Sequence, residues 1–278
     1  MIWWIVSLAF VLRFGWVLVA HTYRFRLADH FDFGQEIGCI ARSLVLGRGF
    51  ASPFPEWSGP TTWIGPIYPF LLACVFKVFG LYSTVSALVM LGLNCLFSAL
   101  TCWPLFCIAR EVANRRVALM ATLLWAIVPT FMTWAVFSVW DASFTTLIVT
   151  GIVWVGLNLG RRVTLRTWLA FGFLWGFAAL LNPSLLSFLP CSVGYVAWQA
   201  RARHERWMAP AALCCFVVLL TVTPWFIRNY RVFGKPVFIR GNFWAQSLCP
   251  PTPPGITSSI SAVCSSSTAC PWWCTPTA

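Results

Sequence analysis

The few carboxylates of this chain are the residues best suited to chemistry. The sequence has seven Asp and Glu residues among 278. Asp32 and Glu36 are four positions apart, which places two side chains on one face of a helix, and Asp141 begins a long apolar run. A carboxylate within hydrogen-bond reach of a hydroxyl group can act on it as a general base. Other roles stay open: two carboxylates can bind a metal or be solvated, and Asp141 can cap its helix.

Basic side chains in the same parts of the chain are candidates for binding an anionic phosphate. Arginine suits this role because its planar guanidinium group forms two parallel hydrogen bonds to phosphate. The alternative for each residue is contact with lipid headgroups. The candidates are Arg42, Arg48, Lys77, Arg228, Arg231, Lys235 and Arg240.

Motifs of other common chemistries are missing from the sequence. It has no Walker loop, no GxSxG and no HExxH motif. Twelve cysteines are present, but no CxxC pair or His-rich cluster offers a zinc site. We therefore predict no metal ligands and no cofactor, although a divalent metal is compatible with the sequence.

The composition indicates an integral membrane protein. Hydrophobic residues make up 59% of the chain and charged residues 9%, with a mean hydropathy of +0.78, whereas soluble domains carry about 25% charged residues. The net charge of +12 would suggest nucleic acid in a soluble protein. Here basic residues cluster in short loops, as on the cytoplasmic face of membrane proteins, so nucleic acid is not expected as a partner.

Long apolar runs predict an all-α, polytopic transmembrane bundle of about seven spans. A spanning helix needs about 20 apolar residues. The expected spans are Ile2 to Ala20, Val85 to Ile108, Val117 to Val136, Ala142 to Leu159, Trp168 to Leu181, Leu185 to Trp198 and Ala209 to Ile227. The basic clusters between them are Arg110, Arg115 and Arg116; Arg161, Arg162 and Arg166; and Arg201, Arg203 and Arg206.

The positions of these clusters predict the topology. Because all three clusters are expected on the cytoplasmic side, two spans must separate each cluster from the next, and the hinges between these spans, at Asp141 and Asn182, are external. One span directly precedes Arg110, so the start of the Val85 run is also external. The apolar stretch Ile67 to Gly80 is short and contains Lys77, which favours an interfacial segment over a span. The loop from His21 to Gly65, with an expected helix from Gln35 to Leu46, is then also external and the N-terminus cytoplasmic. If the stretch crosses instead, that loop is cytoplasmic.

The two ends of the chain allow further interpretations. The first apolar run could be a signal peptide, but it lacks a positive start, so an uncleaved span is preferred. Residues 1–245 are predicted to form the membrane module. Residues 246–278 are rich in Pro, Ser, Thr and Cys without charge, and they are either a disordered end or the product of an altered reading frame or truncated gene.

The order of several short motifs resembles the amino-terminal half of class C glycosyltransferases of the family 39 type, especially the bacterial members. This group includes protein O-mannosyltransferases and aminoarabinose transferases. The resemblance covers about residues 5–245. Its motifs are Phe33 to Ala41, Leu46-Gly47-Arg48-Gly49-Phe50, Gly59-Pro60-Thr61-Thr62, Pro66 to Leu72, Phe79-Gly80 and Pro224 to Tyr230.

The resemblance implies roles for particular residues. Such enzymes use an acid in the first external loop as base on the acceptor hydroxyl and a second acid at the next external hinge. The usual Asp-Glu pair falls here on Phe33 and Gly34, a departure from the pattern. Glu36 is the preferred first acid, with Asp32 as the alternative, and Asp141 is the second. Substrate-binding roles fall on Lys77, Arg42, Arg228, Arg231, Tyr68 and Asn182, with Lys77 and the Arg228/Arg231 pair at the lipid phosphate.

We therefore predict a membrane glycosyltransferase that moves a sugar from a polyprenyl-phosphate donor to the hydroxyl group of a lipid or protein acceptor, with inversion. The resemblance implies a bacterial inner membrane and a periplasmic active face. One alternative is a transporter or flippase, but Arg13 is the only charge deep within an expected span. The other is an inactive truncated protein, because a tail follows Ala245 where the relatives continue.

Overall fold

The computed structural model describes residues 2–25, 33–55, 58–159, 164–204 and 207–241. Their regular structure is helical, apart from an isolated bridge between Ala51 and Pro60, which confirms the predicted all-α polytopic class. Residues 1–240 form one compact unit. The helices are α1 (Ile2–Val19), α2 (Glu36–Val45), α3 (Ile67–Phe79), α4 (Thr84–Leu100), α5 (Cys102–Val112), α6 (Arg115–Ile127), η2 (Pro129–Phe131), α7 (Thr133–Phe137), α8 (Ala142–Leu159), α9 (Leu165–Leu181), η3 (Pro183–Phe188), α10 (Leu189–Ala202) and α11 (Met208–Phe233).

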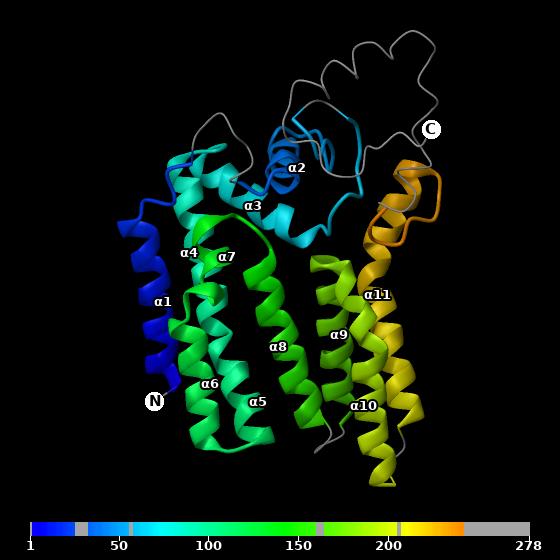
Figure 1. Ribbon diagram of the computed structural model, residues 1–278. Helices are drawn as coiled ribbons and strands as arrows, with labels where there is room; N and C mark the ends of the chain where they lie inside the picture. The colour runs from blue at the N-terminus through cyan, green and yellow to red at the C-terminus, as the bar shows by residue number, and fades with distance from the viewer. Residues whose placement is uncertain (1, 26–32, 56–57, 160–163, 205–206, 242–278) are drawn as a thin grey trace, which may run out of the picture. The chain divides into compact units, whose positions relative to one another are not determined.

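Several of these helices are suited to cross a membrane. In the described part of the chain, four stretches are long and apolar enough: α1, α4 with α5, α8, and α11. Helix α9 is apolar but shorter. The chain reverses direction at each step through α1, α4–α5, α6–α7, α8, α9, α10 and α11, which stand side by side (Figure 1). This path follows the succession of spans expected from the sequence.

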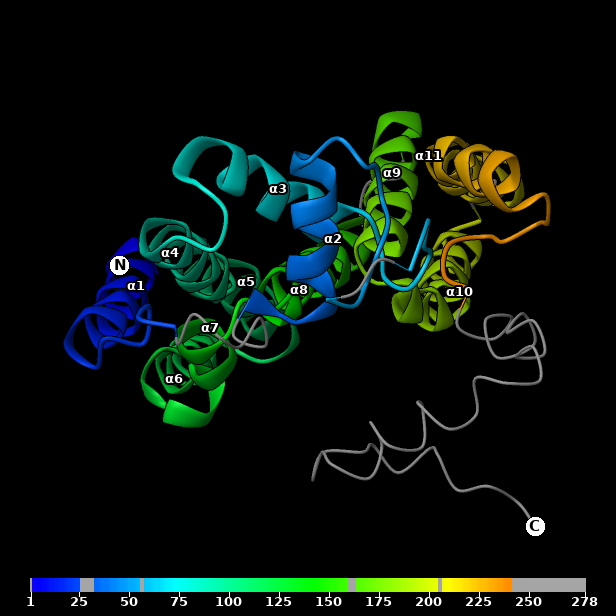
Figure 2. The ribbon, with the colours of Figure 1, turned by 90° about the horizontal axis from the view of Figure 1, so that it is seen from above.

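The three basic clusters lie together at one end of this bundle. The turn from α5 to α6, the start of α9 and the turn from α10 to α11 lie at one end (Figure 1), and they carry the described arginines of the three basic clusters. Helices α2 and α3 lie at the other end. Helix α3 covers the stretch Ile67 to Gly80 that was predicted not to span, and it lies across the ends of the long helices beside α2 (Figures 1 and 2).

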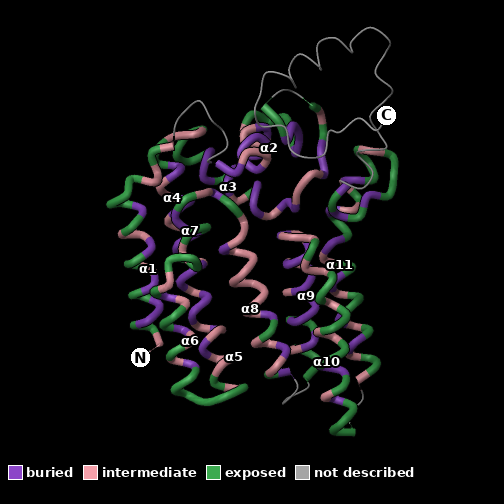
Figure 3. Tube along the Cα trace, viewed as in Figure 1, coloured by how far each residue is buried: buried purple, intermediate pink, exposed green. Residues whose placement is uncertain are grey.

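Buried residues line the interior of the bundle, and the outer faces are exposed (Figure 3). The outer face of α1 carries large apolar side chains, with Trp4 79% exposed, as expected for a helix that contacts lipid. Helices α9 and α11 approach closely at Gly172 and Gly176, where an added Cβ would overlap Cys214, Val217 or Thr221. Small residues four apart are a common means of helix packing in membranes.

The expected span Val117 to Val136 is interrupted, which corrects the prediction of one continuous helix. Helix α6 ends at Ile127, and η2 and α7 follow. Pro129 causes the break because proline lacks an N–H and restricts the residue before it. The carbonyl of Trp125 would normally accept from residue 129. Instead it accepts from Arg13 Nη2 at 2.7 Å, and the Ala126 carbonyl accepts from Arg13 Nη1 at 3.1 Å.

Candidate active site

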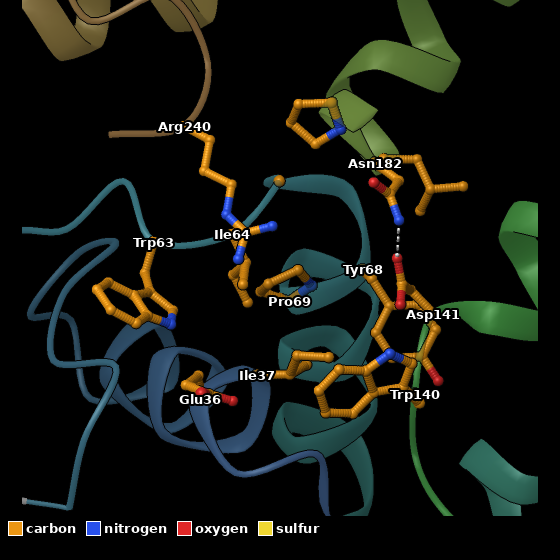
Figure 4. A pocket seen from close by; sticks show the side chains of 13 residues that line it. Glu36, Ile37, Trp63, Ile64, Tyr68, Pro69, Trp140, Asp141, Asn182 and Arg240 are labelled. Atoms are coloured by element: carbon orange, nitrogen blue, oxygen red, sulfur yellow. Dashed lines mark hydrogen bonds between the residues drawn. The ribbon is translucent and has the colours of Figure 1, made fainter. Parts of the chain in front are cut away.

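A pocket of about 140 Å³ opens at the end of the bundle that carries α2 and α3 (Figure 4). It brings together four of the residues that were predicted to form the site: Glu36, Tyr68, Asp141 and Asn182. These residues come from α2, α3, the segment before α8 and the segment after α9. The remaining lining residues are Ile37, Trp63, Ile64, Gly65, Pro69, Trp140, Leu181, Pro183 and Arg240.

Asp141 is held by two neutral hydrogen-bond donors. Its Oδ2 atom accepts from the side-chain amide of Asn182 at 3.3 Å (Figure 4). It also accepts from the Thr145 hydroxyl at 3.3 Å. Burial raises the pKa of the Asp141 carboxyl above its ordinary value, whereas these two bonds and the positive charge of Arg240 act in the opposite direction. The net effect is a carboxylate that takes up a proton more readily than an exposed aspartate.

Glu36 enters the pocket at the first residue of α2. The turn before it is pressed against the segment that leads to Asp141: a Cβ on Gly34 would overlap the carbonyl oxygen of Val139. Gly34 also has a φ of 72°, which glycine adopts at little cost. This glycine therefore brings the start of α2 against the backbone two residues before Asp141.

A second close approach forms the wall that carries Asn182. A Cβ on Gly65 would overlap the carbonyl oxygens of Leu180 and Leu181 at the end of α9. The backbone between Trp63 and α3 therefore lies directly against the residues that precede Asn182. Together the two glycines allow four separate segments to approach one another around one cavity.

Tyr68 is buried on α3, and its hydroxyl group donates a hydrogen bond of 2.9 Å to Asn94 Oδ1. Burial raises the pKa of Tyr68 above its ordinary value. The hydroxyl group therefore stays protonated and remains a donor at neutral pH.

The positive charge at this pocket comes from Arg240, whose side chain extends toward Ile64 (Figure 4). Arg240 was expected among the external basic residues but not in the predicted site. Trp63 and Trp140 were also missed. The sequence pattern does not indicate that these three residues line the pocket, because they lie in connecting segments whose paths depend on the packing of α3, α8 and α11.

Several predicted substrate-binding residues are not part of this lining. Lys77 is exposed in the last turn of α3, and Arg231 is exposed near the end of α11. Arg42 Nη2 donates to the carbonyl oxygen of Pro55 at 3.0 Å. Asp32, the alternative first acid, lies outside the described residues.

Arg228 has a different environment from the one expected of a phosphate ligand. Its guanidinium group donates to the carbonyl oxygens of Phe50 at 2.8 Å and Thr61 at 2.9 Å. It also lies over the rings of Phe50, Trp225 and Phe233, at 5.5, 5.0 and 5.8 Å from their centroids. These contacts tie the end of α11 to the loop between α2 and α3.

The part of the chain that the structure describes contains no group of three or more His, Cys, Asp or Glu side chains that could hold a metal ion. In the pocket itself, Glu36 and Asp141 are the metal-binding residue types. Two carboxylates are fewer than the oxygen ligands that calcium takes, whereas magnesium is commonly bound by one or two carboxylates together with substrate phosphates.

The fold and pocket define a multi-pass membrane protein with two acids and an arginine around a cavity at one end of its helical bundle. The model of the dolichyl-phosphate-mannose-protein mannosyltransferase family matches residues 60–227. The chain belongs to this family, and it is a membrane glycosyltransferase of mannosyltransferase type. The matched range includes Tyr68, Asp141 and Asn182, whereas Glu36 and Arg240 lie outside it. No curated protein and no solved structure matches the chain.

Proposed function

We propose that this pocket transfers a sugar from a polyprenyl-phosphate donor to a hydroxyl group of a lipid or protein acceptor. The observation that carries the proposal is the meeting of Glu36, Asp141 and Arg240 around one cavity, in a chain that belongs to a mannosyltransferase family. Two acids and a cation supply what the transfer requires: a base for the acceptor and a positive charge for the leaving phosphate.

The transfer is a single displacement. The acceptor oxygen forms a bond to the anomeric carbon, the bond from that carbon to the phosphate oxygen breaks, and the configuration inverts. The acceptor proton passes to a carboxylate, for which we propose Glu36. Asp141 is held by Asn182 and Thr145, which suits a group that orients the acceptor or assists the base.

Polyprenyl phosphate leaves with a negative charge that needs stabilisation. Arg240 is the cation that lines the pocket, and a preorganised cation lowers the energy of the developing charge. We propose it for the phosphate-binding role that the resemblance implied for Lys77 and the Arg228/Arg231 pair. Tyr68 is buried and lines the same cavity.

We further propose that the pocket faces the external side of a bacterial inner membrane. Residues of α2 and α3 line it, and these helices lie at the end of the bundle opposite the arginine-rich turns (Figure 1). Such turns favour the cytoplasm. The lipid-linked donor would then reach the pocket from the outer leaflet, which is in keeping with a catalytic end that adjoins the membrane spans.

The test is transfer of radiolabelled mannose from polyprenyl phosphate to endogenous acceptors in membranes that contain the protein. Glu36→Gln and Asp141→Asn should each lower transfer by about 100-fold or more, the usual contribution of general acid–base catalysis. Glu111→Gln, in the last turn of α5, removes a carboxylate that does not line the pocket and should have no effect. Undiminished transfer in either pocket variant, at equal membrane content, removes that residue from the mechanism.

A further inference from the structure

Helix α4 presents three buried polar side chains to α1, to α7 and to the segment that precedes Asp141. Asn94, Cys95 and Ser98 are 0%, 0% and 2% exposed, and they occupy neighbouring positions of one helix face. Burial of polar groups in a helical bundle is costly unless they form hydrogen bonds. Each of the three forms such contacts, so these side chains, which we call the polar stripe of α4, are satisfied within the interior.

The hydrogen-bond partners of these three side chains lie on α1, on α7 and in the segment after α7. Ser98 Oγ accepts from Arg13 Nε at 3.0 Å, and the Cys95 thiol is 3.6 Å from the carbonyl oxygen of Ala135 in α7. Asn94 Nδ2 donates to the carbonyl oxygen of Ser138 at 3.3 Å. Asn94 thus supports the Ser138 carbonyl, a main-chain group that lies between α7 and α8 outside a regular helix, whereas Cys95 contacts α7 and Ser98 contacts Arg13 of α1.

Asn94 also contacts Tyr68, a residue that lines the pocket. Its Oδ1 atom accepts from the Tyr68 hydroxyl at 2.9 Å, while its amide nitrogen donates to the carbonyl oxygen of Ser138. A side-chain amide has both an acceptor and donors, so one residue joins α3 to the segment between α7 and α8. The Ser138 carbonyl also accepts from the Trp140 N–H at 3.1 Å, and Asp141 comes next.

We propose that Asn94 is a positioning residue that fixes Asp141 in the pocket by holding the turn at Ser138, with Tyr68 acting on that turn through Asn94. This inference rests on the proposed role of Asp141 in transfer. Asn94 does not line the pocket itself, so its effect on the reaction is indirect.

The titration of Asp141 reports its position because the carboxyl depends on near neighbours. The charged and titratable groups around it are Glu36 on α2, Tyr68 on α3 and Arg240 after α11. The Asn182 amide and Arg240 both stabilise the charged form. If the turn at Ser138 shifts, Asp141 moves from these groups, and its pKa rises further.

The experiment measures this titration directly on the full-length protein in detergent. Dicyclohexylcarbodiimide modifies protonated carboxyl groups, so the extent of Asp141 labelling against pH, read by peptide mass spectrometry, gives the midpoint without any activity assay. Asn94→Leu should move the midpoint upward by about one pH unit, a tenfold change in proton affinity. Tyr68→Phe should give a smaller shift in the same direction, and the double variant should not exceed Asn94→Leu.

Asn158→Leu is the matched control, because Asn158 is exposed on α8 and its amide donates to the Trp154 carbonyl oxygen. It should leave the midpoint unchanged. In parallel, transfer by Asn94→Leu and Tyr68→Phe should fall in kcat, by roughly 10- to 100-fold for a displaced catalytic group, with little change in KM.

The outcomes separate this inference from the proposed function. An unchanged midpoint in Tyr68→Phe and in folded Asn94→Leu overturns the positioning role, even if Asp141→Asn abolishes transfer. A shifted midpoint with full transfer by Asp141→Asn supports the positioning of Asp141 but removes its role in transfer. A loss of thermal stability in Asn94→Leu without any shift in midpoint shows a structural role only.

Discussion

The carboxylate of Asp141 accepts a hydrogen bond of 3.3 Å from the side-chain amide of Asn182, 41 positions further along the chain. Asp141 directly precedes α8 and Asn182 directly follows α9, so this bond links the ends of two neighbouring helices at the pocket. It is made to the charged form of the acid. The bond therefore opposes the effect of burial, which favours the protonated form.

This relationship predicts the pH dependence of the transfer reaction. The pKa of Asp141 already lies above its ordinary value, about 3.9 for aspartate, so acidification should inactivate the enzyme at a higher pH than expected for an exposed aspartate. Asn182→Leu removes a bond to the carboxylate and should move the acidic limb of the kcat/KM profile further upward. The measurement is the transfer rate from polyprenyl-phosphate mannose across the pH range.

Thr145→Val provides a second test that the protonation of Asp141 sets the acidic limb of the profile. It removes the other neutral donor to Asp141 but leaves the shape of the side chain nearly unchanged, so its acidic limb should also move upward. A profile that stays in place in both variants would show that Asp141 does not control the acidic limb.

The arrangement of the helices was largely accessible from the sequence. Apolar runs and clustered arginines predicted the order of the long helices, and the position of α2 followed from its periodicity. The break in Val117 to Val136 was missed because the run is apolar throughout, although Pro129 marks the place. The donor that compensates this proline, Arg13, is 112 residues away from the carbonyl of Trp125, and sequence spacing does not reveal such a pairing.

The residues of the candidate site could be predicted from the sequence only in part. Glu36, Asp141, Tyr68 and Asn182 were expected and line one pocket. The basic residues were harder to assign, because residue type and expected side of the membrane are the same for Arg228 and Arg240. What separates them is the aromatic surroundings of Arg228 and the path of the segment after α11, both of which result from tertiary packing.

Gly65→Ala should distort the pocket. An added Cβ would overlap the carbonyl oxygens of Leu180 and Leu181, and a helix end cannot yield as a flexible side chain can. The loop before α3 must then move away from Asn182. We expect transfer to fall by at least about tenfold, as small displacements at a catalytic site cost this much or more. Gly151→Ala is the matched control, since its Cβ would meet nothing within 4 Å. Equal activity of the two variants would show that this close approach is dispensable.

Arg13 and Pro129 should be energetically coupled. Arg13→Leu removes the donor to the Trp125 and Ala126 carbonyl oxygens, and each buried carbonyl left without a partner costs about 1–3 kcal/mol. In Pro129→Ala the backbone regains an N–H four residues after Trp125. We therefore expect Arg13→Leu to lower the thermal midpoint less in the Pro129→Ala background than in the wild type. The double-mutant cycle measures this difference, and additive effects would argue against the compensation.

The two arginines near the end of α11 should respond differently to substitution. Arg228→Lys keeps the charge but loses the two bonds to the Phe50 and Thr61 carbonyl oxygens and the flat contact with aromatic rings, so the change is not conservative. It should lower the thermal midpoint in detergent. Arg240→Ala removes the cation of the pocket and should raise the KM for polyprenyl-phosphate mannose, or lower kcat, with little loss of stability.

Arg231→Ala is the matched control for both variants, because this residue is exposed near the end of the same helix and does not line the pocket. It should leave the midpoint and the kinetics close to those of the wild type. A kinetic defect confined to Arg228→Lys, with normal stability and a normal Arg240→Ala, would return the phosphate-binding role to Arg228 and contradict the role proposed for Arg240.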